Sequence, residues 1–194
     1  MKGTVEGFLF MNRVTVGMGD YQIVRHPAVI ETVALGSCVG VILHCRDTRI
    51  TGLAHIMLPA SVKTEARGAD ALPAGLVQGG AGLGFPQASA AKLKPGKYAD
   101  TAIKEMLEKM LQAGAKKDKL LAKMAGGASM FTGVGNEWMQ IGFKNIAMSK
   151  SILKELNIAL VAEDCGSNFG RTVEFSTETG KLTIRSAQHG SKDI

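Results

Sequence analysis

Hydrophobic positions along this chain recur at two spacings, one typical of helices and the other typical of strands. The clearest helix is predicted over 99–113, where apolar residues recur at helical spacing between a candidate N-cap, Asp100, and a stop signal, Gly114. A second helix is expected over 142–156. Shorter apolar and β-branched runs predict strands or hairpins at 13–18, 21–24, 39–58, 120–125, 158–163 and 171–186. Helices interspersed with hairpins predict an α/β fold, layered as a sandwich of mixed strands.

The hairpin over 39–58 brings a cysteine and a histidine within reach of each other. Cys38 precedes its first strand, and His55 lies in its second strand. A four-residue turn at 46–49 would make them diagonal neighbours on one face, with Cβ atoms ~7 Å apart. A two-residue turn at Arg46-Asp47 would place them directly opposite at ~5 Å. A three-residue loop would place them on opposite faces, so the spacing permits a nucleophile–base pair without proving one.

Such a pair carries the chemistry of acyl transfer. An imidazole beside a thiol accepts its proton, the thiolate attacks a carbonyl carbon, and the imidazolium then protonates the leaving group. Gly36 and Ser37 precede the cysteine and offer backbone N–H groups to an oxyanion. In the alternative interpretation Cys38 is a small buried hydrophobe and His55 a hydrogen-bonded core histidine. Taken alone, the two residues favour this alternative. The surrounding motifs favour the nucleophile–base pair instead.

Ordered motifs over about 14–186 surround this pair. They lie at 32–39, 54–55, 57–59, 97–102, 126–131, 141–142 with Asn145, 163–164, Asn168, 170–171 and 178–181. In this order and spacing they closely resemble the CheD family, the chemoreceptor glutamine deamidases of bacterial and archaeal chemotaxis. Two departures from the family pattern are Ser167, where a second glycine is common, and the length of the segment over 60–96.

The resemblance implies an enzyme that hydrolyses side-chain amides of selected glutamines on methyl-accepting chemotaxis receptors, giving glutamate and ammonia. It assigns the nucleophile to Cys38, the base to His55 and an orienting hydroxyl to Thr32. A hydroxyl suits that role because the second imidazole nitrogen has to be held to fix the tautomer. The expected course is attack by Cys38, an oxyanion held by backbone N–H groups, and hydrolysis of a thioester. Neither a metal nor an organic cofactor is expected.

The resemblance also implies an α/β/α sandwich and two kinds of protein partner. The receptors' cytoplasmic helices are the expected substrate, and family members also bind the CheC phosphatase. The main alternative function is therefore a regulatory binding module for CheC, with the cysteine site as a docking cleft. Receptor glutamate methyl esters have the same carbonyl geometry, so a methylesterase side activity is a secondary hypothesis. A peptide-bond protease is a third class, which predicts cleavage products.

Composition narrows the class of protein. The 194 residues carry a formal net charge of +6, with 45% hydrophobic and 21% charged residues, as is ordinary for a globular domain. We expect no signal peptide or membrane insertion, and three cysteines without an export signal indicate a reducing cytoplasm. Cys45 and Cys165 are expected to be structural thiols. Basic residues are dispersed and do not interleave with aromatic ones, so the charge favours an acidic partner over nucleic acid.

Two further features complete the expectations. His44 and Cys45, together with Cys38 and His55, are residue types that bind zinc, but adjacent strand residues point to opposite faces, so no zinc site is expected. The stretch over 60–96 is rich in Ala, Gly and Pro and is predicted to be a long flexible loop, not a dinucleotide site. We expect one domain over 1–194, with a polar C-terminal tail from about 187.

Overall fold

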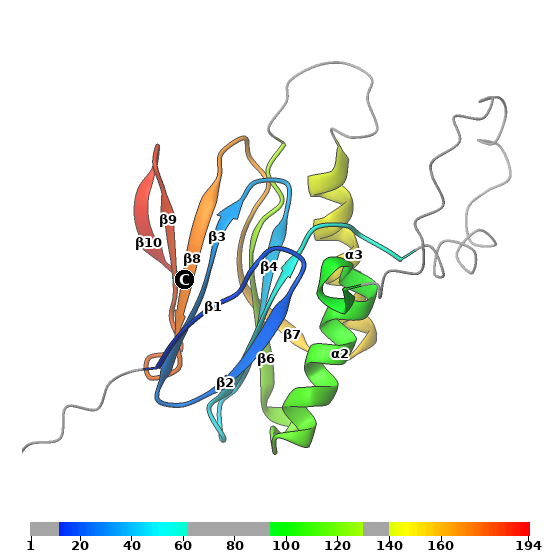
Figure 1. Ribbon diagram of the computed structural model, residues 1–194, viewed down its shortest axis with the longest axis vertical. Coiled ribbons are helices and arrows are strands. Elements are labelled where there is room, and N and C mark those ends of the chain that lie inside the picture. Colours follow the sequence, from blue (N-terminus) through cyan, green and yellow to red (C-terminus); the bar gives the residue numbers. More distant parts are fainter. Residues whose placement is uncertain (1–11, 62–93, 130–139) are drawn as a thin grey trace, which may run out of the picture.

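A computed structural model of the protein describes residues 12–61, 94–129 and 140–194 (Figure 1). In these residues, two five-stranded sheets pack face to face. Sheet A contains, in order across the sheet, β1 (Asn12–Thr15), β3 (Ala28–Leu35), β8 (Arg171–Ser176), β9 (Leu182–Ser186) and β10 (Gly190–Asp193). Sheet B contains, in order, β2 (Tyr21–Arg25), β5 (Ile50–Ile56), β4 (Val39–Cys45), β6 (Leu120–Gly126) and β7 (Ala159–Cys165).

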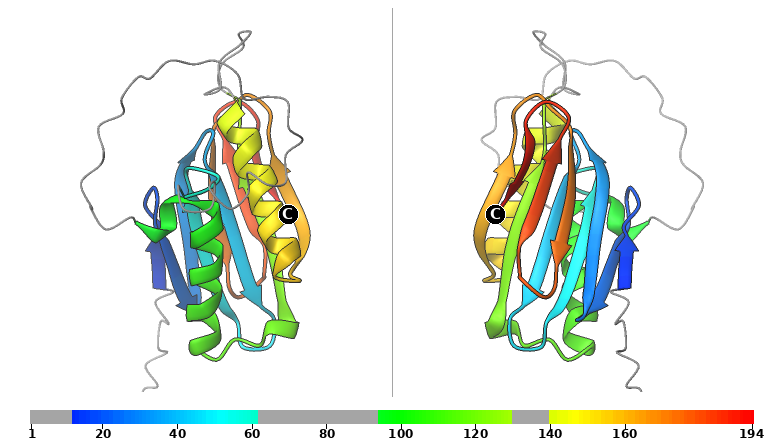
Figure 2. Two further views of the ribbon diagram at one scale, coloured as in Figure 1. Left: turned by 90° about the vertical axis from the view of Figure 1, so that its right-hand side faces the viewer. Right: turned by 90° about the vertical axis from the view of Figure 1, so that its left-hand side faces the viewer.

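Two α-helices of the described residues cover the outer face of sheet B. They are α2 (Ala99–Gln112) and α3 (Ile141–Glu155), which lie side by side (Figure 2). The 3-10 turns η2 (Pro95–Lys97) and η3 (Lys117–Lys119) flank α2. The apolar stripe of α2 is buried against the sheet, and a Cβ at Gly52 on β5 would lie only 2.7 Å from the Met106 side chain. The glycine therefore allows α2 to approach the sheet closely.

A second core fills the space between the two sheets. Its buried residues include Ile42 and Leu53 from sheet B and Leu35, Val173 and Phe175 from sheet A. Every residue of β4 and β5 is buried, because one face meets the helices and the other meets sheet A. This double burial explains the near-continuous apolar runs of the predicted hairpin.

The α/β class with mixed strands and hairpins is confirmed. Both predicted helices are present, and β8 and β9 form the expected antiparallel hairpin. The layers differ from the expected α/β/α order, since both described helices lie on one face of sheet B and sheet A covers the other. The alternating burial along β8 gives sheet A one apolar face, which takes the place of a second helical layer.

Three features of the strands were not expected from the sequence. The segment before Cys38 forms β3, which a bulge interrupts between Thr32 and Leu35. The strands on either side of the turn at 17–20 belong to different sheets, since β1 pairs parallel with β3 and β2 pairs antiparallel with β5. The polar C-terminal stretch contributes β10, which pairs with β9.

Two other expectations concern the loop over 60–96 and the membrane. Most of that loop lies outside the described residues. Across the three described ranges, no helix combines the length and the apolar character needed to cross a membrane.

Candidate active site

The hairpin of β4 and β5 has the register that places Cys38 and His55 on one face. Gly40 lies opposite His55 and His44 opposite Thr51, as a four-residue turn at 46–49 requires. Cys38, immediately before β4, is thus a diagonal neighbour of His55. Both residues are directed into the space between the sheets, where Cys38 packs against the second core.

Thr32 holds the imidazole of His55 from the opposite sheet. Its hydroxyl lies 2.7 Å from Nδ1 of His55 and 2.7 Å from the carbonyl oxygen of Val16. The hydroxyl has one hydrogen, which it donates to Val16, so it accepts a hydrogen bond from Nδ1–H of His55. This fixes the tautomer in which Nε2 carries the free lone pair. Nε2 is fully buried and has no hydrogen-bond partner among the described residues.

The turn between β1 and β2 fixes the backbone of His55. The His55 N–H donates to the Asp20 carbonyl oxygen at 2.9 Å, and the Gly19 N–H donates to the His55 carbonyl oxygen at 3.0 Å. Gly19 has a φ of +68°, a conformation that glycine adopts without a steric penalty. The imidazole is therefore held at both its ring and its backbone.

The Cys38 segment is held by the glycine turn that follows β6. The Gly127 N–H donates to the Cys38 carbonyl oxygen at 2.7 Å, and the Ala128 N–H donates to the Gly36 carbonyl oxygen at 2.8 Å. Gly126 has a φ of +109°, and a Cβ there would lie 2.3 Å from the Cys38 carbonyl oxygen. A glycine is thus needed at 126 for this close approach.

The backbone N–H groups before the thiol are not equivalent. The Gly36 N–H donates to the Ala34 carbonyl oxygen at 3.0 Å, so it is already satisfied. Among the described residues, the N–H groups of Ser37 and Cys38 have no backbone acceptor. The Cys38 N–H acts to lower the pKa of its own thiol, against the larger effect of burial. The N–H groups of Ser37 and Cys38 are therefore open to a further acceptor, whereas that of Gly36 is not.

Burial keeps both members of the pair neutral. It raises the pKa of the Cys38 thiol, although the cysteine's own backbone N–H opposes this, and it lowers the pKa of His55. No hydrogen bond joins Cys38 to His55 in the described part of the chain, since Nε2 has no partner there. The resting site therefore consists of a thiol and a neutral imidazole rather than a thiolate–imidazolium ion pair.

Asn145 on α3 joins the segment before Cys38 to the segment after His55 through two hydrogen bonds. Its Nδ2 donates to the carbonyl oxygens of Ser37 at 2.9 Å and of Met57 at 3.0 Å, while its Oδ1 is buried without a partner among the described residues. Gly142 lets α3 come this close, because a Cβ there would lie 2.5 Å from the Gly127 carbonyl oxygen. In the sequence analysis Asn145 belongs to one of the ordered motifs, and no role was assigned to it. The available signal was a run of small and polar residues at helical spacing, Gly142, Asn145 and Ser149.

The segment over 163–171 packs against the glycine turn, since the Gly166 N–H donates to the Gly126 carbonyl oxygen at 2.8 Å. Arg171 is 2% exposed and donates from Nε and Nη2 to the Asp164 carboxylate at 3.2 and 3.1 Å. Burial raises the pKa of Asp164, but Arg171 and Lys192 outweigh it, so its pKa lies below the ordinary value. Ser167 has a φ of +63°, a conformation that a glycine adopts without a steric penalty.

The residues considered for zinc lie apart. His44 packs against Phe175 between the sheets, with ring centroids 5.1 Å apart, whereas Cys45 is buried beneath the helices. The prediction that the two adjacent residues point to opposite faces is confirmed. Within the described ranges, no group of three or more His, Cys, Asp and Glu side chains is arranged to hold a metal ion.

Comparisons with known proteins agree with these motifs. A family model described as "CheD chemotactic sensory transduction" matches residues 85–186. A chemoreceptor glutamine deamidase CheD from Halalkalibacterium halodurans is 42% identical over 182 residues, which cover 93% of this chain and 98% of the relative. The protein of the same name from Thermotoga maritima is 39% identical over 91% of this chain and 94% of its own. A probable chemoreceptor glutamine deamidase CheD from Caldanaerobacter subterraneus is 38% identical, with 92% and 96% covered.

Proposed function

The chain belongs to the CheD family, and on that premise we propose that it is an amide hydrolase that converts glutamine side chains of chemoreceptors to glutamate. The observation that carries the proposal is the hydrogen bond from His55 to Thr32, because it leaves Nε2 as a base on the face shared with Cys38. Because the proposed substrate lies on the receptors' cytoplasmic helices, we propose that the protein acts in the cytoplasm.

The proposed reaction has two halves that share one base. In the first half, Nε2 of His55 takes the Cys38 thiol proton as the sulfur attacks the glutamine δ-carbon. The N–H groups of Cys38 and Ser37 hold the oxyanion, and the imidazolium protonates the departing nitrogen, which leaves as ammonia. In the second half, His55 deprotonates a water that attacks the thioester. The imidazolium returns the proton to the sulfur, which releases glutamate and restores the thiol.

A hydroxyl at position 32 suits this cycle better than a carboxylate would. Thr32 holds Nδ1–H in place without adding a negative charge beside the ring. The imidazolium formed during each half-reaction is therefore stabilised little and remains a strong acid toward the leaving group. Burial acts in the same direction, since it lowers the pKa of His55.

The presence of Thr32, Cys38 and His55 together favours an enzyme over a binding module alone. A pure adaptor has no chemical need for a nucleophile, a base and a hydroxyl that orients the base. Binding of a CheC phosphatase remains part of the proposal as a second partner, and hydrolysis of receptor glutamate methyl esters as a side activity at the same carbonyl geometry.

A purified receptor cytoplasmic fragment tests the proposal. Wild-type protein should release ammonia and convert particular receptor glutamines to glutamate, identified by peptide mass, in equal amounts. A methylated fragment should in addition release methanol if the side activity exists. Absence of glutamine conversion, with tight binding to CheC retained, would indicate that the protein is a regulatory binding module and not an enzyme. Chain cleavage would indicate a protease.

A further inference from the structure

A hollow unrelated to the Cys38 site lies at the other end of the sheets. It has a volume of about 410 Å³ and is formed by the turn after β4, strands β6 and β7, and the turn between β8 and β9. His44 lines it and lies six positions along the chain from Cys38, a separation of about 20 Å on an extended strand. Its lining includes His44, Arg46, Arg49, Lys123, Glu178 and Thr179, and we call it the basic hollow because three of these side chains are cationic.

Positive charge exceeds negative charge in the basic hollow, where Arg46, Arg49 and Lys123 share the lining with the carboxylate of Glu178. Ion pairs join the arginines on the outer face of sheet A to carboxylates, as with Arg13 and Arg185 at Glu174. In contrast, no Asp or Glu side chain of the described residues forms an ion pair with Arg46, Arg49 or Lys123. Three cations that share one concave surface repel one another, and an anion there would remove that repulsion.

The three cations converge on His44. Burial, followed in order of importance by the charges of Lys123, Arg46 and Arg49, lowers the pKa of His44 to about 4. Its Nδ1 is 2.8 Å from the Thr51 hydroxyl. The imidazole is therefore neutral at physiological pH and senses the field of all three neighbours.

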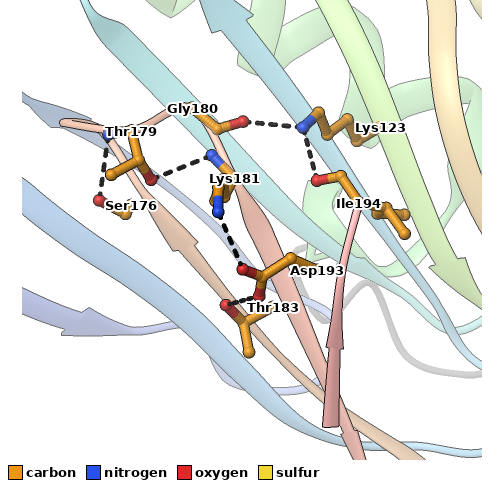
Figure 3. Close-up of polar contacts among 8 residues, drawn as sticks. All are labelled: Lys123, Ser176, Thr179, Gly180, Lys181, Thr183, Asp193 and Ile194. Carbon is orange, nitrogen blue, oxygen red and sulfur yellow. Dashed lines mark hydrogen bonds and ion pairs between the residues drawn. The ribbon is translucent and has the colours of Figure 1, made fainter.

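Lys123 is fixed in position before any ligand arrives. Its Nζ donates to the backbone oxygens of Gly180 and Ile194, each at 2.7 Å (Figure 3). An ammonium group has three N–H donors, so one is left over after these two bonds. Burial lowers the pKa of Lys123, and the Asp193 carboxylate opposes this only in part, so the charge keeps a desolvation cost that an anion would offset.

We propose that the basic hollow binds the phosphate group of a small phosphorylated molecule. Two guanidinium groups and one held ammonium group provide the forked and point-charge donors that phosphate oxygens accept. The volume lies in the range of small-molecule sites and exceeds what a phosphate group alone fills, so an organic portion has room. The site is separate from Cys38 and does not depend on the proposed deamidase activity.

Calorimetric titration with inorganic phosphate and with a nucleoside monophosphate tests the proposal. Wild-type protein should bind at least one probe saturably in a chloride buffer, and Arg46→Gln with Arg49→Gln should weaken binding about tenfold or more. The double variant Arg13→Gln with Arg185→Gln makes the same change in charge on the outer face of sheet A and should bind as wild type does. Preference for inorganic phosphate identifies the free ion as ligand, and preference for the nucleotide identifies an organic phosphate.

A second readout ties binding to this location. A bound anion favours the protonated imidazole, so saturating phosphate should raise the pKa of His44 measured by NMR. Both double variants change exposed arginines, and their thermal unfolding should match that of the wild type. The proposal is overturned by a lack of saturable binding, by equal weakening in both double variants, or by a His44 titration that phosphate leaves unchanged.

Discussion

The Thr32 hydroxyl accepts a hydrogen bond from Nδ1 of His55 across the interface between the two sheets, at 2.7 Å. Thr32 belongs to β3 of sheet A, and His55 belongs to β5 of sheet B. The proposed base is therefore set in its tautomer only when the sheets are packed together. Folding of the core and assembly of the site are one event.

Replacement of Thr32 tests that hydrogen bond. Thr32→Val keeps the shape but removes the acceptor, so the ring is free to adopt the wrong tautomer, and kcat/KM for receptor deamidation should fall roughly 100-fold. Thr32→Ser keeps the hydroxyl and should restore most of the rate. Equal rates in wild type and Thr32→Val would remove Thr32 from the proposed site.

The pH dependence of the thiol follows from burial. Because the pKa of Cys38 is raised, its alkylation by iodoacetamide should increase through a pH range above that of an ordinary cysteine. Because the pKa of His55 is lowered, the imidazole stays a base in mildly acidic solution, and the acid limb of kcat/KM should lie below pH 6.5. Rapid alkylation at neutral pH with an acid limb above that value would instead indicate a resting ion pair.

Asn145 acts in this account as a positioning residue. Asn145→Ala removes two hydrogen bonds from buried carbonyl groups and should lower the free energy of unfolding by about 1–3 kcal/mol. It should also lower kcat with little change in KM, because the Cys38 and His55 segments lose their common tie. Ser149→Ala, one turn further along α3, removes a buried hydroxyl that has no partner in the described residues and should affect neither. Denaturant unfolding and steady-state kinetics provide the comparison.

A comparison of two glycine variants distinguishes the effect of backbone strain from the effect of a steric clash near the Cys38 thiol. Gly126 and Gly114 have φ values of +109° and +98°, but a Cβ meets the Cys38 carbonyl oxygen at 2.3 Å only at position 126; at 114 nothing lies within 4 Å. Gly126→Ala should therefore cost roughly 1–3 kcal/mol more than Gly114→Ala and reduce the deamidation rate. Similar stability and activity of the two variants would mean that the Cys38 carbonyl is not constrained by this turn.

His44 makes the fold sensitive to acid. Its folded pKa of about 4 lies below the ordinary value of 6.5, so as the pH falls the unfolded chain takes up the proton first. The stability is complete above pH 6.5 and declines toward pH 4, with a loss from His44 of about 2 kcal/mol between pH 7 and pH 5. His44→Gln should lack this part of the decline in urea titrations at the two pH values. An identical decline in both proteins would assign it elsewhere.

The sequence predicted the elements whose pattern is local. Helix α2 shows one apolar stripe, and the hairpin of β4 and β5 is set by its polar turn, so both were recognisable. Strand β3 was missed because a bulge and a φ of +59° at Ala34 break its alternation, although the motif marked Thr32 within it. The order of the layers was not accessible from single elements, since it depends on which apolar faces meet.

The same distinction applies to the functional residues. The expected chemistry at Cys38 and His55 depended on one hairpin, and the register of that hairpin follows from the turn. Asn145 was quoted in a motif, but its two carbonyl partners come from distant segments, Ser37 and Met57. The basic hollow combines two turns that are more than a hundred residues apart in the sequence, so no local sequence pattern predicts it.

Cys38→Ala measured against Cys165→Ala on a receptor fragment tests the central claim most directly. Burial and the Glu163 charge raise the pKa of Cys165 to about 12, so its thiol is inert and its replacement is a matched control. We expect Cys38→Ala to abolish ammonia release and glutamine conversion, and Cys165→Ala to retain both at the wild-type rate. Conversion by Cys38→Ala at a rate near that of wild type would contradict the account, since no other described residue is assigned the nucleophile's role.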